Sequence, residues 1–144
     1  MDETFDRVRS ASDGRYRYIR NDFPSLPYAQ RNRYQQTSLT TQAMRKLDAE
    51  GKLSYPSNVY MQRTKPPEEL YDSDADPDNV KNLAEDPALA PKLAELRSAL
   101  SAELERVGDM GLITEEDLVA RGLIIDRLGE YRARIEPQIG RAHV

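Results

Sequence analysis

Residues 68–84 of this chain read EELYDSDADPDNVKNLA, and the other predicted elements are arranged around this stretch. A short apolar segment, Leu70 and Tyr71, precedes an acidic turn closed by Asp76-Pro77. The segment Asn82-Leu83-Ala84, here called the Asn82 segment, then ends the stretch. Aromatic side chains suit a pleated strand, whereas proline and aspartate favour a turn through a fixed φ and side-chain hydrogen bonds. The stretch therefore predicts a short strand, a tight turn and then the start of the next element.

The clearest helix of the chain is predicted directly after this turn. Asp86-Pro87 combines a capping residue with proline at the first helical position. Apolar residues then recur every three or four positions until Gly108, which predicts an amphipathic helix; they are Leu89, Leu93, Leu96, Leu100, Leu104 and Val107. A further helix is expected to begin at Thr114 and to continue through Leu118, Ile125, Leu128, Tyr131 and Ile135.

The residues before the strand are predicted to form a hairpin, a loop and short helices. Asp13-Gly14 is a turn signal between two strands within residues 4–21, and the prolines in residues 22–36 indicate a loop. Helices are predicted from a cap at Ser38 or Thr40 to about Glu50, and within residues 55–63. The predicted fold class is α+β, a small antiparallel sheet packed by a long C-terminal helix, plus peripheral helices. Because so few strands are available, we expect the sheet to need neighbours from outside this chain.

Composition sets broad limits on the function. The chain has 144 residues, enough for one domain, with 38% hydrophobic and 32% charged residues, which favours a modest core. The net charge is −4 and the basic residues are dispersed, so we expect no nucleic-acid partner. No apolar run reaches membrane-spanning length, so no membrane partner is expected either. The absence of cysteine excludes disulfides and thiolate metal sites, and it leaves the cellular compartment open.

Alternating carboxylates at Asp72, Asp74, Asp76 and Asp78 invite comparison with a calcium-binding loop. In the twelve-residue loop of an EF-hand, the sixth position requires glycine and the twelfth requires glutamate. Here the corresponding residues, counted from Asp72, are Pro77 and Leu83. We therefore favour a structural interpretation, in which the aspartates cap local amides, and we assign no metal ligand.

For two other features we prefer a structural explanation to a functional one. The arginines and tyrosines that alternate over residues 15–18 suggest stacking on nucleic acid, but they also fit a strand with one aromatic face and one solvated face. His143, the sole histidine, lies next to the C-terminus, where a general base has no fixed position. We expect the strand, and we assign His143 no role.

The order of these motifs resembles the sulfatase family, hydrolases of sulfate esters and sulfamates with an alkaline-phosphatase-like fold. The resemblance is carried by the Arg-Tyr-Ile-Arg-Asn type of strand at residues 15–21, by residues 68–84 and by the Gly-Asp-x-Gly turn at residues 108–113. It is closest to bacterial heparan N-sulfatase-like and arylsulfatase-like enzymes. The signature residues, all expected to be structural, are Tyr18, Asn21, Leu70, Tyr71, Asp72, Asp76, Pro77, Asn82 and Leu83.

The resemblance implies that residues 1–110 are the C-terminal subdomain of a sulfatase fragment and residues 111–138 a helical extension. Sulfatases use a Cys-x-Pro-x-Arg motif, with serine for cysteine in some, whose first residue matures to formylglycine. Residues 25–29 and 54–58 begin with Ser-x-Pro or Ser-Tyr-Pro patterns but lack the arginine, so we expect loops there. No catalytic residue is assigned. By the same resemblance, calcium and formylglycine are expected in a missing catalytic domain, while Asp2 and Glu3 are expected near the substrate cleft or in a plain structural role.

The resemblance also implies a partner and a substrate. The partner is the catalytic sulfatase domain of the same parent chain, and the parent's substrate is a sulfated carbohydrate or an aryl sulfate. The parent is expected to be periplasmic or secreted, although this segment carries no signal for either compartment. The alternative is a free-standing protein-interaction or calcium-binding module, which predicts a cooperatively folding monomer.

The last six residues, 139–144, have the sequence IGRAHV. A DNA string that resembles a common sequencing adapter encodes this peptide followed by a stop. We therefore expect these residues to be an artefact at the end of a truncated environmental gene.

Overall fold

The computed structural model describes residues 4–126 and 129–130. Two compact units are present, a larger one of residues 2–109 and a smaller one that begins at Met110. Within the described residues, none of the helices has both the length and the apolar character needed to cross a membrane.

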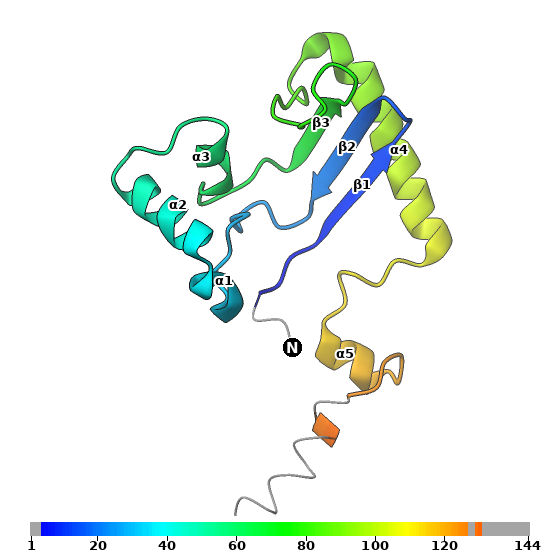
Figure 1. Cartoon of the computed structure of the whole chain (residues 1–144). Coiled ribbons are helices and arrows are strands. Elements are labelled where there is room, and N and C mark those ends of the chain that lie inside the picture. The colour runs from blue at the N-terminus through cyan, green and yellow to red at the C-terminus, as the bar shows by residue number, and fades with distance from the viewer. Residues whose placement is uncertain (1–3, 127–128, 131–144) are drawn as a thin grey trace, which may run out of the picture. The chain divides into compact units, whose positions relative to one another are not determined.

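The larger unit contains a three-stranded antiparallel sheet of β1 (Val8–Ser12), β2 (Tyr16–Asn21) and β3 (Glu68–Asp72), in the order β1-β2-β3 (Figure 1). The β1–β2 hairpin turns at Gly14, whose φ of 103° suits glycine, and Asp13 Oδ1 accepts hydrogen bonds from the amides of Arg15 and Tyr16. In the register, Tyr18 lies opposite Leu70. The predicted hairpin and the predicted strand at Leu70-Tyr71 are both confirmed.

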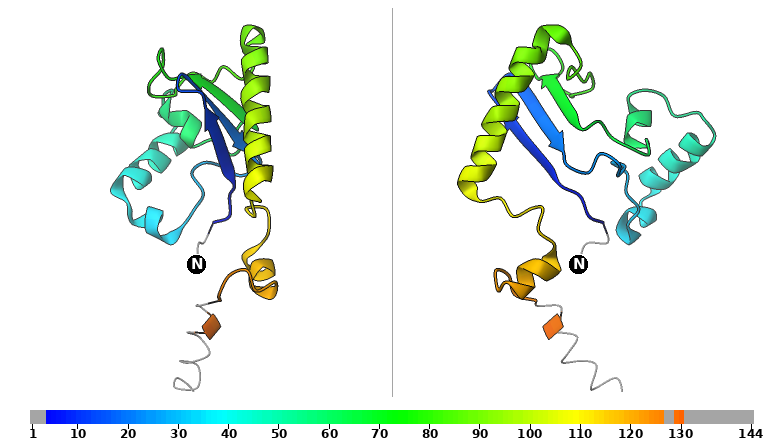
Figure 2. Two further views of the ribbon diagram at one scale, coloured as in Figure 1. Left: turned by 90° about the vertical axis from the view of Figure 1, so that its right-hand side faces the viewer. Right: turned by 180° about the vertical axis from the view of Figure 1, so that it is seen from behind.

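The long helix packs along one face of this sheet, as both views in Figure 2 show. It begins with the 3-10 turn η1 (Pro87–Leu89) and continues as α4 (Ala90–Val107). Asp86 Oδ1 caps the turn by accepting from the Ala88 amide at 2.9 Å, and Gly108 ends the helix with a φ of 63°. The buried core comprises Tyr18, Leu70, Leu93, Leu96 and Leu100. The predicted α+β fold is therefore confirmed, with three of the periodic leucines forming the buried face.

Three short helices connect β2 to β3: α1 (Arg33–Thr37), α2 (Leu39–Ala49) and α3 (Ser57–Tyr60). The prediction of a loop over residues 22–36 is wrong at its end, because the Asn32 side chain accepts from the Gln35 amide at 2.7 Å and starts α1. Ser38 caps α2 as predicted. The helix predicted within residues 55–63 is confirmed as α3, and because Ser57 begins it, the loop expected over residues 54–58 is wrong at its end.

The smaller unit contains α5 (Glu115–Ala120). The Thr114 side chain accepts from the Asp117 amide at 3.2 Å and caps the helix, as predicted. The helix was expected to continue through Ile125, but it ends at Ala120 and Gly122 follows with a φ of 68°. A left-handed glycine stops the helix because the next turn cannot keep its hydrogen-bond pattern. Leu128, Tyr131, Ile135, His143 and residues 139–144 lie outside the described residues.

Candidate functional site

The Asn82 segment, residues 82–84, lies along the outer edge of β3. Asn82 Oδ1 accepts from the amides of Leu70 and Ala84, each at 3.0 Å, and its Nδ2 donates to the Glu68 carbonyl at 3.3 Å. The Leu83 amide donates to the Leu70 carbonyl at 2.7 Å. Asn82 and Leu83 thus satisfy the backbone of an otherwise open strand edge, which an exposed sheet must protect.

Carboxylates in the acidic turn accept hydrogen bonds from the backbone. Asp72 Oδ1 accepts from the amides of residues 74 and 75, and Asp76 Oδ2 accepts from those of residues 80 and 81, the latter pair at 2.7 Å each. Pro77 follows Asp76 directly and holds the turn. Arg15 donates to Asp72 Oδ2 at 2.6 Å, and this hydrogen bond lowers the pKa of Asp72. Within the described residues, no group of three or more histidines or carboxylates is placed to hold a metal ion.

A buried carboxylate, Glu69, links strands and loop on the sheet face opposite α4. It is 5% exposed, and its Oε1 accepts from Asn21 Nδ2 and the Tyr28 hydroxyl, both at 2.6 Å. Its Oε2 accepts from the Tyr71 hydroxyl at 2.5 Å. Burial and the adjacent Glu69 raise the pKa of both tyrosines, so each hydroxyl keeps its proton. This cluster therefore acts as a structural cross-link between β2, β3 and the loop after β2.

A second carboxylate cluster lies on the α4 side of the sheet. Glu68 accepts from the Tyr18 hydroxyl at 2.5 Å and from a two-pronged Arg97 contact at 2.6 Å for each bond. Arg97 is the main cause that lowers the pKa of Glu68. Burial, and then Glu68, raise the pKa of Tyr18 to about 12. Tyr18 thus contributes its ring to the core and its hydroxyl to a hydrogen bond between β2 and β3, while Arg97 connects Glu68 to α4.

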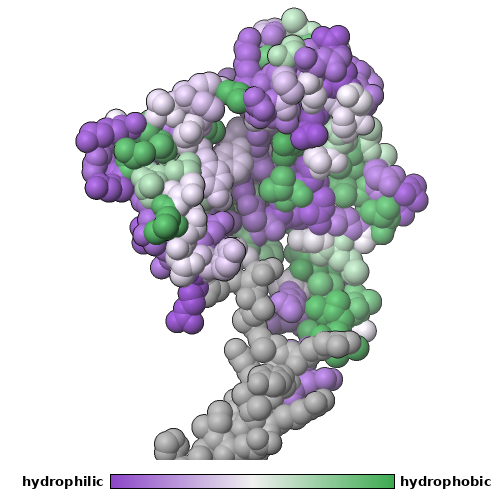
Figure 3. All heavy atoms as spheres, in the orientation of Figure 1, coloured by the Kyte–Doolittle hydropathy of each residue, from purple (hydrophilic) through white to green (hydrophobic). Residues whose placement is uncertain are grey.

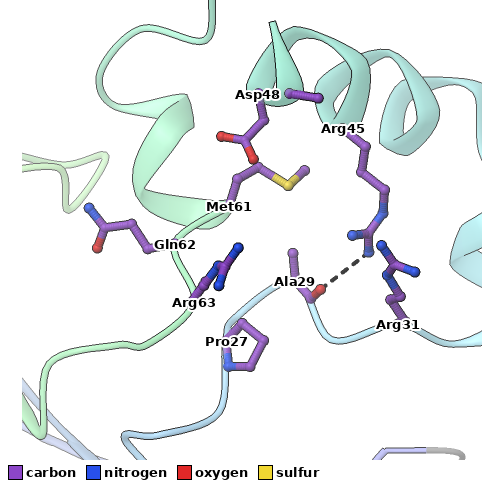
Figure 4. A pocket seen from close by; sticks show the side chains of 9 residues that line it. Pro27, Ala29, Arg31, Arg45, Asp48, Met61, Gln62 and Arg63 are labelled. Atoms are coloured by element: carbon purple, nitrogen blue, oxygen red, sulfur yellow. Dashed lines mark hydrogen bonds between the residues drawn. The ribbon is translucent and has the colours of Figure 1, made fainter. Parts of the chain in front are cut away.

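The larger unit contains a recess of about 470 Å³, here called the arginine recess (Figure 4). Arg31, Arg45 and Arg63 line it, and Asp48 is the one carboxylate in its wall. Figure 4 shows Arg45 reaching down from α2 to end beside Arg31, while Arg63 approaches from the segment after α3. The remaining lining residues are Pro27, Ala29, Ala49, Met61 and Gln62.

An adjoining recess of about 290 Å³ shares two of these arginines. Arg31 and Arg45 line both hollows, and the adjoining recess adds Gln36, Thr41 and Gln42. Arg45 donates to the Ala29 carbonyl at 3.2 Å, which orients its guanidinium (Figure 4). The lining of the arginine recess holds no serine, threonine, tyrosine or histidine. Three guanidinium groups in one wall suit the binding of an anion.

The structure places the residues singled out from the sequence in three groups. Tyr18 and Leu70 meet in the core, whereas Asn21 and Tyr71 meet at Glu69; the turn and edge residues are Asp72, Asp76, Pro77, Asn82 and Leu83. Asp2 and Glu3 lie outside the described residues, so their placement near a cleft stays a prediction.

Sequence reasoning missed Glu69 and the arginine recess. The alternation of side chains along β3 could have predicted that Glu69 has an environment of its own. Neighbouring residues of a strand point to opposite faces, so Glu68 and Glu69 lie on different sides of the sheet. The three arginines of the recess come from three separate segments and carry no common spacing.

Comparisons with known proteins give one curated relative. No family model matches the chain. The chain is 37% identical over 119 residues to the Ulvan-active sulfatase of Formosa agariphila, a match that covers 83% of this chain and 20% of the relative. The chain thus spans about a fifth of the length of the relative that it matches. The similarity supports a sulfatase family and is consistent with a piece of a larger sulfatase chain.

Proposed function

We propose that this chain is a non-catalytic C-terminal segment of a sulfatase, which supports the fold and the substrate cleft of its parent enzyme. The observation that carries this proposal is the 37% identity over 119 residues to a part of the Formosa agariphila enzyme that amounts to 20% of its length. The order of the motifs at residues 15–21, 68–84 and 108–113 supports a C-terminal position and a subfamily near the bacterial heparan N-sulfatase-like enzymes.

The contacts of the described residues support a scaffolding role. Three carboxylates of the sheet are engaged: Glu69 with three donors, Glu68 with Tyr18 and Arg97, and Asp72 with Arg15 and backbone amides. These three carboxylates therefore stabilise the fold, and none of the three is free to take a proton from a substrate. The catalytic groups, a formylglycine and calcium, would then belong to another part of the parent chain.

Exposed apolar side chains support a contact with that other part. Tyr34 is 86% exposed and Leu39 80% exposed, and Figure 3 shows apolar residues on the surface of the α1–α3 region among polar ones. Exposed apolar side chains of this region would be covered if the region docked on another part of the parent protein. We propose the catalytic part of the same parent chain as the partner and a sulfated carbohydrate, or an aryl sulfate, as the parent's substrate.

A chimera tests the proposal directly. The matching segment of the Formosa agariphila sulfatase is replaced by this chain, and release of sulfate from ulvan is measured. We expect the chimera to be folded and active, whereas the enzyme without the segment, and this chain alone, release no sulfate. A matched chimera with Glu69→Ala should lose folded protein, because three donors are then left unpaired.

Two results would contradict the proposal. Hydrolysis of a sulfate ester by the purified chain alone would show that the segment is itself catalytic. A chimera that fails to fold, while the isolated chain folds as a stable monomer, would favour an independent module instead.

A further inference from the structure

We propose that the arginine recess and its adjoining recess bind an anionic saccharide, with a sulfate ester or a carboxylate held by the arginines. This inference deepens the proposed function by locating a binding site within this chain, and it rests on that function for the saccharide. The anion-binding arrangement itself belongs to this chain.

Charge is the first support. The arginine recess has three guanidinium groups in its wall against one carboxylate, in a chain whose net charge is −4. Within the described residues, neither Arg31 nor Arg63 forms an ion pair. Several arginines elsewhere do pair with carboxylates, among them Arg7, Arg9, Arg15, Arg20, Arg97 and Arg106. Two recess arginines are thus free to hold an external oxyanion, which the planar guanidinium group binds through paired hydrogen bonds.

The position of Arg45 adds a second support. Its Nε is buried and has no hydrogen-bond partner within the described structure, although its terminal nitrogen donates to the Ala29 carbonyl. Both Arg31 and Arg45 line the two recesses, and Figure 4 draws their guanidinium groups next to each other. Like charges repel at such close range, so an anion between them would relieve the repulsion.

The shape of the recess fits a sugar ring better than a bare ion. Its volume of about 470 Å³ falls in the range of small-molecule sites. Pro27, Ala29 and Met61 supply an apolar wall, and Ala29 is only 6% exposed. An apolar wall beside convergent charged groups suits a ring with C–H faces and an anionic substituent.

The adjoining recess extends the site. It carries side-chain amides from Gln36 and Gln42 and a hydroxyl from Thr41, which are suitable partners for sugar hydroxyls. Because Arg31 and Arg45 lie in both walls, one chain of linked sugar units can pass from one hollow to the next. A single acidic side chain from the parent protein would not fill the volume of the two recesses. It would also leave these neutral polar groups without hydrogen-bond partners.

The test titrates the isotope-labelled 144-residue chain, followed by NMR, with four probes: glucose 6-sulfate, glucuronate, glucose and inorganic sulfate. We expect signals of the recess to shift with the two anionic sugars, and much less with glucose or inorganic sulfate. Arg63→Gln and Arg31→Gln should each weaken binding by about tenfold or more. Arg17→Gln is the matched control, because Arg17 is exposed and lies on β2. This substitution changes the net charge by the same amount and should leave binding unchanged.

Several results would overturn the inference. Equal binding of inorganic sulfate and glucose 6-sulfate would mean a simple ion site, and equal weakening by Arg17→Gln would mean non-specific attraction. The same substitutions in the active chimera give an independent readout, where Arg63→Gln should raise KM for ulvan about tenfold and leave kcat unchanged. An unchanged KM refutes the site, whereas a variant chimera that no longer folds would mean that a carboxylate of the parent protein occupies the recess.

These outcomes also separate this inference from the proposed function. An unfolded or inactive chimera together with intact saccharide binding by the isolated chain would refute the sulfatase assignment alone. An active chimera that is insensitive to Arg31 and Arg63 would refute the recess alone.

Discussion

Substitution of Asn82 by alanine tests the hydrogen bonds between the Asn82 segment and the edge of β3. Asn82 Oδ1 accepts from the Leu70 and Ala84 amides at 3.0 Å each. Leu70 is fully buried, so its amide would lose its acceptor at a place that water reaches poorly. Leaving a buried donor unpaired costs about 1–3 kcal/mol. Because Asn82 itself is exposed, water can replace part of the interaction, and we expect Asn82→Ala to lower the free energy of unfolding by about 1–2 kcal/mol.

Urea unfolding measures this change, and amide hydrogen exchange locates it. Exchange at the Leu70 amide should become faster in Asn82→Ala, while exchange along α4 should change only in step with global stability. Asn82→Asp is the control, since it keeps the acceptor oxygen and should lose less stability than the alanine variant. The reasoning is refuted if Asn82→Ala changes the free energy of unfolding by less than about 0.5 kcal/mol and leaves the Leu70 amide equally protected.

Three further predictions concern the core, an ion pair and pH. Leu70→Ala should lower the free energy of unfolding by about 3–5 kcal/mol because the side chain is fully buried. The control Leu39→Ala, at an 80% exposed position, should change it by less than about 0.5 kcal/mol. Urea titration compares the two variants, and similar losses would contradict the assigned core. Asp109→Asn should cost about 2 kcal/mol, because Arg7, which is 5% exposed, then keeps Asp22 as its sole carboxylate partner among the described residues; an unchanged melting temperature would argue against this pair. The pKa of Tyr18 is raised from 10 to about 12, so its contribution to stability is complete below pH 10 and is lost as pH rises to about 12. Tyr18→Phe should therefore flatten the fall in the free energy of unfolding over this pH window. An identical slope in both proteins would show that Tyr18 does not titrate there.

The smaller errors of the sequence-based prediction have local causes. Residues 33–36 were assigned to a loop because Pro24 and Pro27 dominate the preceding residues, yet the Asn32 cap is sufficient to begin a short helix. The helix after Thr114 was extended too far because apolar spacing was weighted above Gly122. A glycine with a φ of 68° ends a helix whatever apolar residues follow it.

The sequence by itself determined the elements whose signals span a few residues. The Asp13-Gly14 hairpin, the strand at Leu70-Tyr71 and the leucine-spaced helix up to Gly108 all depend on near-neighbour hydrogen bonds or on one repeating face. Interactions of this range are encoded in adjacent residues, so they can be inferred without knowledge of the rest of the chain.

Only the tertiary structure decided which distant residues meet. Glu69 gathers donors from Asn21 and Tyr28, and the arginine recess joins Arg31 to Arg63 across the intervening helices. No local rule links these positions, because their proximity depends on how β2, α2 and the segment before β3 close around one another. Long-range closure is driven by burial, which is largely non-directional and leaves no fixed spacing in the sequence. The family resemblance was therefore readable from motifs along the chain, while the candidate binding site emerged only once the chain was folded.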